Sequence, residues 1–442
     1  MAFIDELIEL AAQPDDRLPP KAMMLARYSL LDWLTCGVAA IDEPLVTKLR
    51  QLAEEEGGKP VAPLFGGGMA PARMAALVNG AASHALDYDD THFAHVGHLS
   101  VGIYPAAMAA GVEQDLGADA ILKAFVVGAE AAIRIGLVLG REHYLMGFHQ
   151  TATAGAFGAT IAAARLYKLD DRQLRNALGL CATRASGLKS QFGTMGKPYN
   201  AGIAASNGIE CARLAALGMT SADDGLLGVQ GFVETHTPQG RGMAGADTAG
   251  RPQGGAFLFE DNKYKLHACC HGLHAMIEAV LDAEALCGRA IKDVAAMTLR
   301  TNPRWLRVCD IKRPRTGLEV KFSYNWLFGM TVRGDKTGDD RAYTDALAAD
   351  QELAALAECI EVIGDESLSD LQAEGVVTLS DGTTVPISHD LAAPLPEDVL
   401  AERLQAKAVA ILGDRGNRIW NQLGGLDALA ARDIGALMAP RA

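Results

Sequence analysis

Residues 151–164 (TATAGAFGATIAAA) and 201–216 (AGIAASNGIECARLAA) consist largely of small side chains. Because small side chains let helix backbones approach closely, both segments are predicted to be central, fully buried helices. Apolar residues also recur three to four apart around them, and no alternating strand pattern interrupts this periodicity up to about residue 217. Further helices are therefore predicted over 21–40, 43–56, 71–86, 104–114, 118–139 and 171–186.

The pattern changes after a Gly-rich segment, 240–255, which is predicted to be a boundary loop. Beyond it, strands are predicted at 294–301, 360–363 and 375–387, the last a hairpin turning at Asp381-Gly382. Helical segments at 271–286, 320–333 and 343–356 are interleaved with these strands, and the tail is helical again over 397–412 and 426–432.

This order predicts a mainly α protein with an α+β lid. The large all-helical domain is expected to comprise 1–258 and 393–442, because a helical tail can return to pack on the first helices. The smaller α+β domain, 259–392, is expected to form a lid over a pocket. A chain of 442 residues with 49% hydrophobic residues is long enough for such a division.

Composition excludes several classes of partner. A net charge of -14 without a basic stripe argues against nucleic-acid binding. The first ten residues carry acids where a targeting peptide carries Lys or Arg, and the apolar run 120–140 contains Lys123, Glu130 and Arg134. We expect a buried helix there, no membrane span, and a cytoplasmic protein whose dispersed cysteines are reduced core residues.

The segment His84-Ala-Leu-Asp-Tyr-Asp-Asp-Thr-His-Phe-Ala-His-Val-Gly-His98 holds four histidines and three aspartates. Titratable groups are costly to bury, so this density indicates the floor of an active site. If the preceding helix continues, His84, Asp87 and Thr91 share one helical face, Gly97 ends the regular structure, and His98 folds back. An acid/base site, a metal site and a solvated polar loop are the alternatives; no HExxH, CxxC or EF-hand spacing accompanies the segment.

Further candidate site residues lie just before, or at the start of, predicted helices. His149 and Gln150 precede the small-residue helix, where the helix dipole favours an anion or a neutral imidazole. Lys197 lies in a Gly-flanked turn after Gln191, and needs an anionic partner in such apolar surroundings. The cluster 263–274 holds adjacent cysteines that fit a zinc site poorly, and Arg315, with Lys321 and Tyr324, suits carboxylate recognition.

Five blocks resemble the MmgE/PrpD family in the family's order: 84–92 with Gly97-His98, 147–153, 193–198, 265–274 and 314–323. The resemblance covers most of the chain and implies a large all-helical domain from both termini, an α+β lid and a homodimer. Known members include 2-methylcitrate dehydratase, cis-aconitate decarboxylase and iminodisuccinate epimerase, which use no metal or organic cofactor. The resemblance to the decarboxylase implies the following pocket residues: Asp87, Thr91, His98, His149, Lys197, Lys265 and Tyr324.

Each of these activities involves a carbon next to a carboxylate, so the expected partner is a di- or tricarboxylate. Cations would hold its carboxylates and stabilise enediolate-like charge: Lys197, Lys265 and Arg315. His98 and His149 are predicted to be the acid/base pair, with Asp87 orienting one imidazole. The substrate-binding candidates are Thr91, Gln150, Gln191, Arg315 and Tyr324.

Three functions remain open on the sequence. A dehydratase acting on a 2-methylcitrate-like acid is the first, with decarboxylation of a cis-aconitate-like acid as a lesser variant. An epimerase of an iminodisuccinate-like dicarboxylate is the second, with Tyr144 as the rival acid/base group. A metal-dependent hydrolase built on the His/Asp segment is the third, and chelator sensitivity would single it out.

Overall fold

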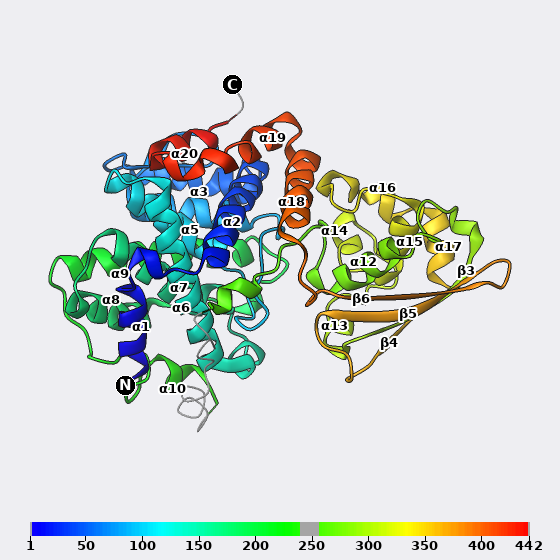
Figure 1. Ribbon diagram of the computed structural model, residues 1–442, viewed down its shortest axis with the longest axis horizontal. Helices are drawn as coiled ribbons and strands as arrows, with labels where there is room; N and C mark the ends of the chain where they lie inside the picture. The colour runs from blue at the N-terminus through cyan, green and yellow to red at the C-terminus, as the bar shows by residue number, and fades with distance from the viewer. Residues whose placement is uncertain (1, 239–255, 441–442) are drawn as a thin grey trace. The chain divides into compact units, whose positions relative to one another are not determined.

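The computed structural model describes residues 2–238 and 256–440, which form two compact units. The first unit is Met1–Tyr264 with Asn417–Ala442, and the second is Lys265–Gly416 (Figure 1). The second unit therefore includes the helix α18 (Glu397–Leu412), which the sequence analysis had placed with the N-terminal helices. The segment predicted to be a boundary loop, 240–255, lies outside the described residues.

The first unit is built from helices, as the apolar periodicity predicts. They are α1 (Phe3–Ala11), α2 (Pro20–Ala39), α3 (Pro44–Glu56), α4 (Ala72–His84), α5 (Ser100–Glu113), α6 (Ala118–Leu145), α7 (Gln150–Leu166), α8 (Asp171–Arg184), α9 (Gly196–Ala216), α10 (Phe232–His236) and α20 (Ala431–Leu437). One short antiparallel pair, β1 (Ala62–Pro63) with β2 (Met69–Ala70), is an element that the sequence pattern did not reveal.

The small-residue segments form the buried helices α7 and α9, as expected. Helix α7 packs against α5, α6 and α9, and α9 packs against α4 as well. Glycines allow the close approach: a Cβ atom added to Gly158 would lie 2.6 Å from the carbonyl oxygen of Gly128 on α6. This packing places candidate residues near one another in the fold: α4 ends at His84, α7 begins directly after His149, and Lys197 is in the first turn of α9.

Some helices of the first unit differ from their predicted bounds; α9, for example, begins at Gly196, five residues before the predicted segment 201–216. Helix α5 begins at Ser100, four residues earlier than expected. In α6 the regular helix stops after residue 139, as predicted, because Gly140 has a non-helical φ of 70° and ψ of 174°; a second helical segment then runs on to Leu145 across this kink. Among the described residues no single helix combines the length and apolarity of a membrane span, although α2 and α3, bent by 89° where they meet, satisfy that test as a pair.

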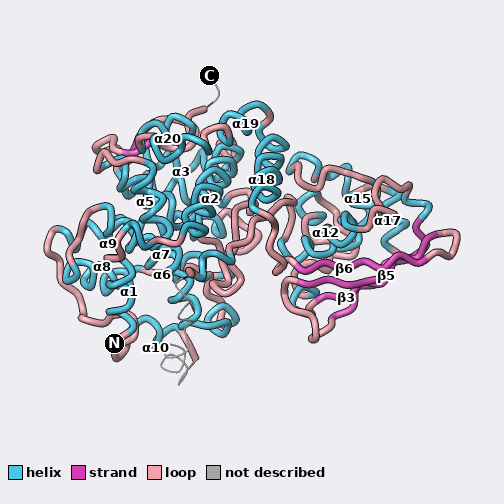
Figure 2. The backbone as a smooth tube through the Cα atoms, viewed as in Figure 1, coloured by secondary structure: helices cyan, strands magenta, loops and turns pink. Residues whose placement is uncertain are grey.

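The second unit is α+β, as predicted. Its sheet has the order β4 (Ile360–Gly364), β3 (Val294–Thr301), β5 (Gln372–Leu379) and β6 (Thr384–Asp390); Figure 2 shows these strands in magenta. Strand β3 pairs parallel with β4, whereas β5 pairs antiparallel with β3 and β6. The hairpin turns at Asp381-Gly382, where Gly382 adopts a φ of 86°. Helix α12 (His274–Asp282) packs on β5 and β6, and α15 (Tyr324–Arg333) packs on α12.

Candidate active site

The segment between α4 and α5 is an irregular loop. Helix α4 ends at His84, and Asp87 turns the chain with a φ of 51°, so the expected common helical face of His84, Asp87 and Thr91 does not form. Thr91 instead exchanges backbone hydrogen bonds with Lys263, at 2.7 and 2.8 Å. The predicted return of the chain at Gly97 is present, and it brings His98 back beside His84.

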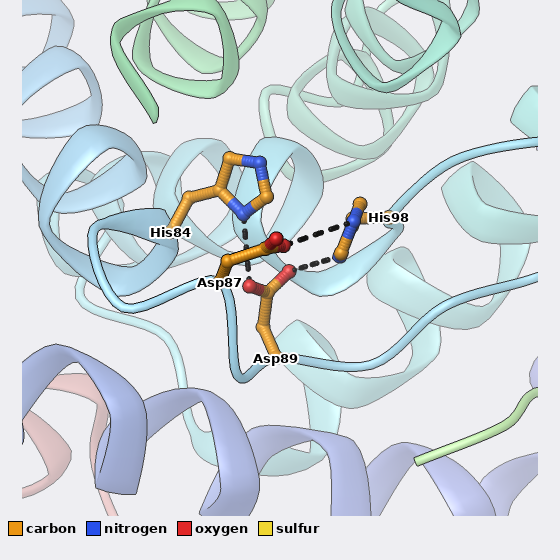
Figure 3. Close-up of side chains that lie close together, drawn as sticks. All are labelled: His84, Asp87, Asp89 and His98. Carbon is orange, nitrogen blue, oxygen red and sulfur yellow. Dashed lines mark hydrogen bonds and ion pairs between the residues drawn. The ribbon is translucent and has the colours of Figure 1, made fainter. Parts of the chain in front are cut away.

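Asp89 joins the two histidines of this loop. One carboxylate oxygen lies 2.8 Å from Nδ1 of His84, and the other lies 2.7 Å from Nδ1 of His98 (Figure 3). The rings meet edge to face, with centroids 4.5 Å apart. Because an ionised carboxylate only accepts hydrogen bonds, Nδ1 of both rings must carry a hydrogen. In the neutral form of each ring, Nε2 therefore has no hydrogen and offers a lone pair.

Asp87 makes a different contact. Its Oδ1 lies 2.6 Å from Nζ of Lys197, in the first turn of α9, and 3.5 Å from Nε2 of His98. Lys197 therefore has the anionic partner that its Gly-rich surroundings require. An ammonium has three N–H donors, so Lys197 keeps donors for a second carboxylate. The carboxylate at hydrogen-bond distance from an imidazole is Asp89 rather than Asp87.

His149 stands at the N-cap of α7, as the sequence indicated. The Asn200 side-chain amide donates to the backbone carbonyl of Leu188 and lies 3.2 Å from Nδ1 of His149. A carbonyl only accepts, so the nitrogen end of the Asn200 amide faces both partners. Nδ1 of His149 is then an acceptor, and the hydrogen of the neutral ring is on Nε2. His149 thus has the opposite tautomer to His84 and His98.

Electrostatics agree with these assignments. Burial by itself would raise the pKa of Asp89, but the two imidazoles outweigh it and hold that pKa well below its usual range. Burial lowers the pKa of His149 well below its usual range, and the positive potential of His84 and Lys197 lowers it further. His149 is therefore a neutral imidazole at physiological pH, whereas Asp89 is ionised.

The metal alternative has a geometric basis. Ligand-type atoms of His84, Asp87, Asp89 and His98 lie within 4.8 Å of one another, the one such group within residues 2–238 and 256–440. Ligands of one ion at about 2.0–2.2 Å stand roughly 3 Å or more apart. The contacts of Asp89 at 2.7 and 2.8 Å instead match charge-assisted hydrogen bonds, and the Lys197 ammonium beside Asp87 would repel a cation. We describe the group as a proton-linked network.

The remaining predicted residues of the first unit are placed as follows. Tyr144, near the end of α6, lies under the ammonium of Lys189, which is 3.6 Å from its ring centroid. Gln150 is buried and donates to the carbonyl of Gly136 at 3.1 Å. Gln191 is exposed, in a short 3-10 helix, and Thr91 is half-buried.

Lys265, Arg315 and Tyr324 belong to the second unit, so their part in the site remains a prediction. Lys265 is buried, and Tyr324 is buried with its hydroxyl donating to the carbonyl of Gly272 at 2.8 Å. The Arg315 side chain is 86% exposed and 3.8 Å from Glu319.

In the cluster 263–274, His267 contacts the Thr337 hydroxyl at 2.7 Å and the Glu278 carboxylate at 2.9 Å. All eight cysteines are free. Five are buried, in line with the expectation, but Cys287 and Cys359 are exposed.

Sequence reasoning singled out neither Asp89, His84 nor Asn200 as a site residue. Asp89 and His84 stood within the quoted segment, and their spacing of five residues gave no reason to prefer them over Asp87. Asn200 carried no local signal, because its partner His149 is 51 residues away.

Comparison with known proteins places the chain. The model of the MmgE/PrpD N-terminal domain matches residues 10–241, and that of the MmgE/PrpD C-terminal domain matches residues 267–418. The chain belongs to the MmgE/PrpD family. A cis-aconitate decarboxylase of Aspergillus terreus (strain NIH 2624 / FGSC A1156) is 31% identical over 280 residues, which are 60% of this chain and 56% of that protein.

A second MmgE/PrpD relative, the cis-aconitate decarboxylase of Homo sapiens, is 35% identical over 156 residues, 34% of this chain and 32% of the human protein. The chain thus spans about half the length, or less, of the curated relatives it matches. Relatives of this kind are lyases, which supports an enzyme of the MmgE/PrpD type.

Proposed function

We propose that this protein is a cofactor-independent hydro-lyase that dehydrates a hydroxy-polycarboxylate resembling 2-methylcitrate. The observation that carries the proposal is the pair of oppositely fixed tautomers in one cluster. Asp89 holds the hydrogen of His98 on Nδ1, and Asn200 holds that of His149 on Nε2. One ring thus offers a lone pair and the other an N–H, which are the two partners that an elimination needs.

The proposed reaction starts at the carbon next to a carboxylate. Nε2 of His98 takes the proton from that carbon, and Asp89 stabilises the imidazolium that forms. The electron pair of the broken C–H bond forms the alkene as the hydroxyl on the neighbouring carbon leaves as hydroxide, which takes a proton from solvent to become water. Nε2–H of His149 donates a hydrogen bond to the substrate oxygen on which negative charge develops in the transition state.

Lys197 is the proposed anchor for a substrate carboxylate. The protein has a net charge of -14, so a polyanion needs a local cation, and Lys197 is held in place by Asp87 at 2.6 Å. The same ammonium would stabilise the enediolate-like charge that grows during proton abstraction. Lys265 remains a second proposed anchor on the family resemblance.

Decarboxylation of a cis-aconitate-like acid is the second candidate, and the names of the curated relatives favour it. The bond to the departing carboxylate breaks, its electron pair moves toward the neighbouring carboxylate, and the carbon takes a proton. This reaction needs His98 to start as the protonated donor, whereas dehydration needs His98 to start neutral. The two candidates therefore predict opposite dependence of kcat/KM on the protonation of His98.

An epimerase is the third candidate, and the contact of Lys189 with Tyr144 favours it. Two proton-transfer groups on opposite faces of one carbon are needed for this reaction. The Lys189 ammonium over the ring is a cation–π contact, which places a cation beside the candidate Tyr144.

Chelator-treated protein incubated in deuterated water with 2-methylcitrate, citrate, cis-aconitate and iminodisuccinate, and followed by proton NMR, tests the proposal. We expect a new alkene signal from a hydroxy-acid. Loss of carbon dioxide from cis-aconitate would replace the proposal with the decarboxylase. Deuterium uptake without a change of skeleton would replace it with the epimerase, and Tyr144→Phe would then abolish the exchange.

A further inference from the structure

His84 is a buried imidazole that the proposed chemistry has not used. Its side chain is inaccessible to solvent, and its Nδ1 is committed to Asp89 at 2.8 Å. Its Nε2 is buried and has no hydrogen-bond partner among the residues that the structure describes. An unpaired buried polar atom costs about 1–3 kcal/mol, so this nitrogen needs a partner that arrives with a ligand.

The ring of His84 faces the other two imidazoles of the site. Its centroid lies 4.5 Å from that of His98 and 6.0 Å from that of His149, the latter nearly stacked with 23° between the planes. A ligand between His98 and His149 would therefore be adjacent to His84 as well.

Charge balance limits how many protons the group can hold. Asp89 has no solvent-exposed surface, and it carries one negative charge shared by two imidazoles. With both rings neutral, the group has a charge of -1; with both protonated, it has a charge of +1. A buried net charge is unfavourable, so the state with a single imidazolium is preferred.

The surrounding charges leave this balance in place. Asp87 and Lys197 form their own pair, and His149 is neutral. Asp90 is the next residue after Asp89; burial raises its pKa, and it accepts hydrogen bonds from Ser100 and Asn262. Burial lowers the pKa of His95 to about 3, so that ring is neutral too.

We infer that His84, Asp89 and His98 hold one proton between the two imidazoles at neutral pH, so that the site contains an acid and a base on a single shared carboxylate. The inference rests on the proposed function only for its catalytic consequence. Nε2 of one ring takes the proton from carbon, and Nε2–H of the other gives its proton to the leaving hydroxyl. Asp89 acts as the positioning residue for both rings.

The shared proton gives the site an acid that can release its proton at neutral pH, which His149 cannot do. A neutral imidazole whose pKa is lowered by burial donates a hydrogen bond but does not release its remaining proton at neutral pH. An imidazolium formed from His84 or His98 releases its proton readily at that pH. After the reaction the two rings again hold one proton: the ring that acted as the base carries the proton taken from carbon, and the proton of the other ring has left in the water.

Ring-nitrogen NMR of the full-length protein with ¹⁵N-labelled histidine tests the inference without any substrate. His84→Asn and His98→Asn assign the signals, since the Asn amide keeps an N–H donor near the position of Nδ1. We expect one imidazolium for the pair across neutral pH, and two separate titration steps at lower and higher pH. Two rings that titrate together near 6.5, with no dependence on each other, would overturn the inference.

Asp89→Asn gives a second readout. Removing the negative charge should lower the pKa of the ring that holds the proton by about one to three units. An unchanged titration in Asp89→Asn protein that keeps its wild-type circular dichroism would contradict the role of Asp89.

Turnover of the accepted acid separates a proton-holding role of His84 from a structural one. His84→Asn keeps the donor to Asp89 but lacks Nε2, so we expect turnover to fall on the order of 10²-fold and the basic limb of the pH profile to vanish. His389→Gln, a histidine substitution on β6, is the control. Full activity of His84→Asn would refute the role of His84, whereas inactivity of the wild-type protein across the panel would reject only the proposed function.

Discussion

Gly158→Ala tests the helix packing that positions the site. A Cβ atom at Gly158 would lie 2.6 Å from the carbonyl oxygen of Gly128, 2.9 Å from the Cβ of Ala132 and 3.0 Å from a methyl of Ile103. Van der Waals contact between such atoms is at about 3.5 Å, so α6 and α7 would have to separate by about 1 Å. Overpacking of this kind costs about 1–3 kcal/mol.

Gly155→Ala is the matched control on the same helix. Gly155 is buried, but a Cβ atom there would meet nothing within 4 Å. Both substitutions gain the same helix propensity, so the difference between the two variants isolates the packing term. At roughly 2–4 °C per kcal/mol, Gly158→Ala should melt about 2–12 °C below Gly155→Ala.

Differential scanning calorimetry of the three proteins measures this difference. Equal melting temperatures for Gly158→Ala and Gly155→Ala would refute the close approach of α6 and α7. Because α7 begins next to His149, a displaced α7 should also lower turnover in Gly158→Ala, and Gly155→Ala should keep it.

Four further outcomes are expected. Asn200→Asp should place the hydrogen of His149 on Nδ1 and reduce turnover on the order of 10²-fold; an unchanged ring-nitrogen spectrum would contradict this. Lys197→Met should raise KM for the acid about 10- to 100-fold, and an unaltered KM would exclude Lys197 as the carboxylate anchor. Burial lowers the pKa of His143 to about 4. The unfolded chain takes up that proton near 6.5, so stability should fall as pH drops from 6.5 to 4, by about 1.4 kcal/mol per unit for this side chain, and thermal melts of His143→Gln should show a shallower slope. Chelator treatment should leave turnover unchanged, and restoration by zinc after a loss would support the metal alternative.

Local sequence pattern predicted the helices of the first unit and the strands of the second, because periodicity and turn chemistry act over a few residues. The hairpin at Asp381-Gly382 formed as expected, since glycine alone adopts the positive φ there without strain. Residues 151–164 became the buried helix α7 for the same kind of reason: their small side chains permit close packing.

The site was harder to predict because its geometry depends on contacts between distant residues. The loop after His84 is held by backbone bonds from Thr91 to Lys263, which nothing near Thr91 in the sequence reveals. The course of this loop turns Asp89 toward the imidazoles of His84 and His98, and Asp87 instead forms an ion pair with Lys197. Asp87 ends up in the left-handed region, a conformation that aspartate tolerates better than most residues.

The most direct test of the proposed chemistry compares wild-type protein with His98→Asn in deuterated water, using the acid that the wild-type protein dehydrates. The Asn side chain keeps the donor to Asp89 and removes Nε2, so the loop should stay in place. We predict that the wild-type protein removes the proton next to the carboxylate and forms the alkene, whereas His98→Asn does so at least about 10²-fold more slowly. Alkene formation by His98→Asn at the wild-type rate would contradict the assignment of His98 as the base.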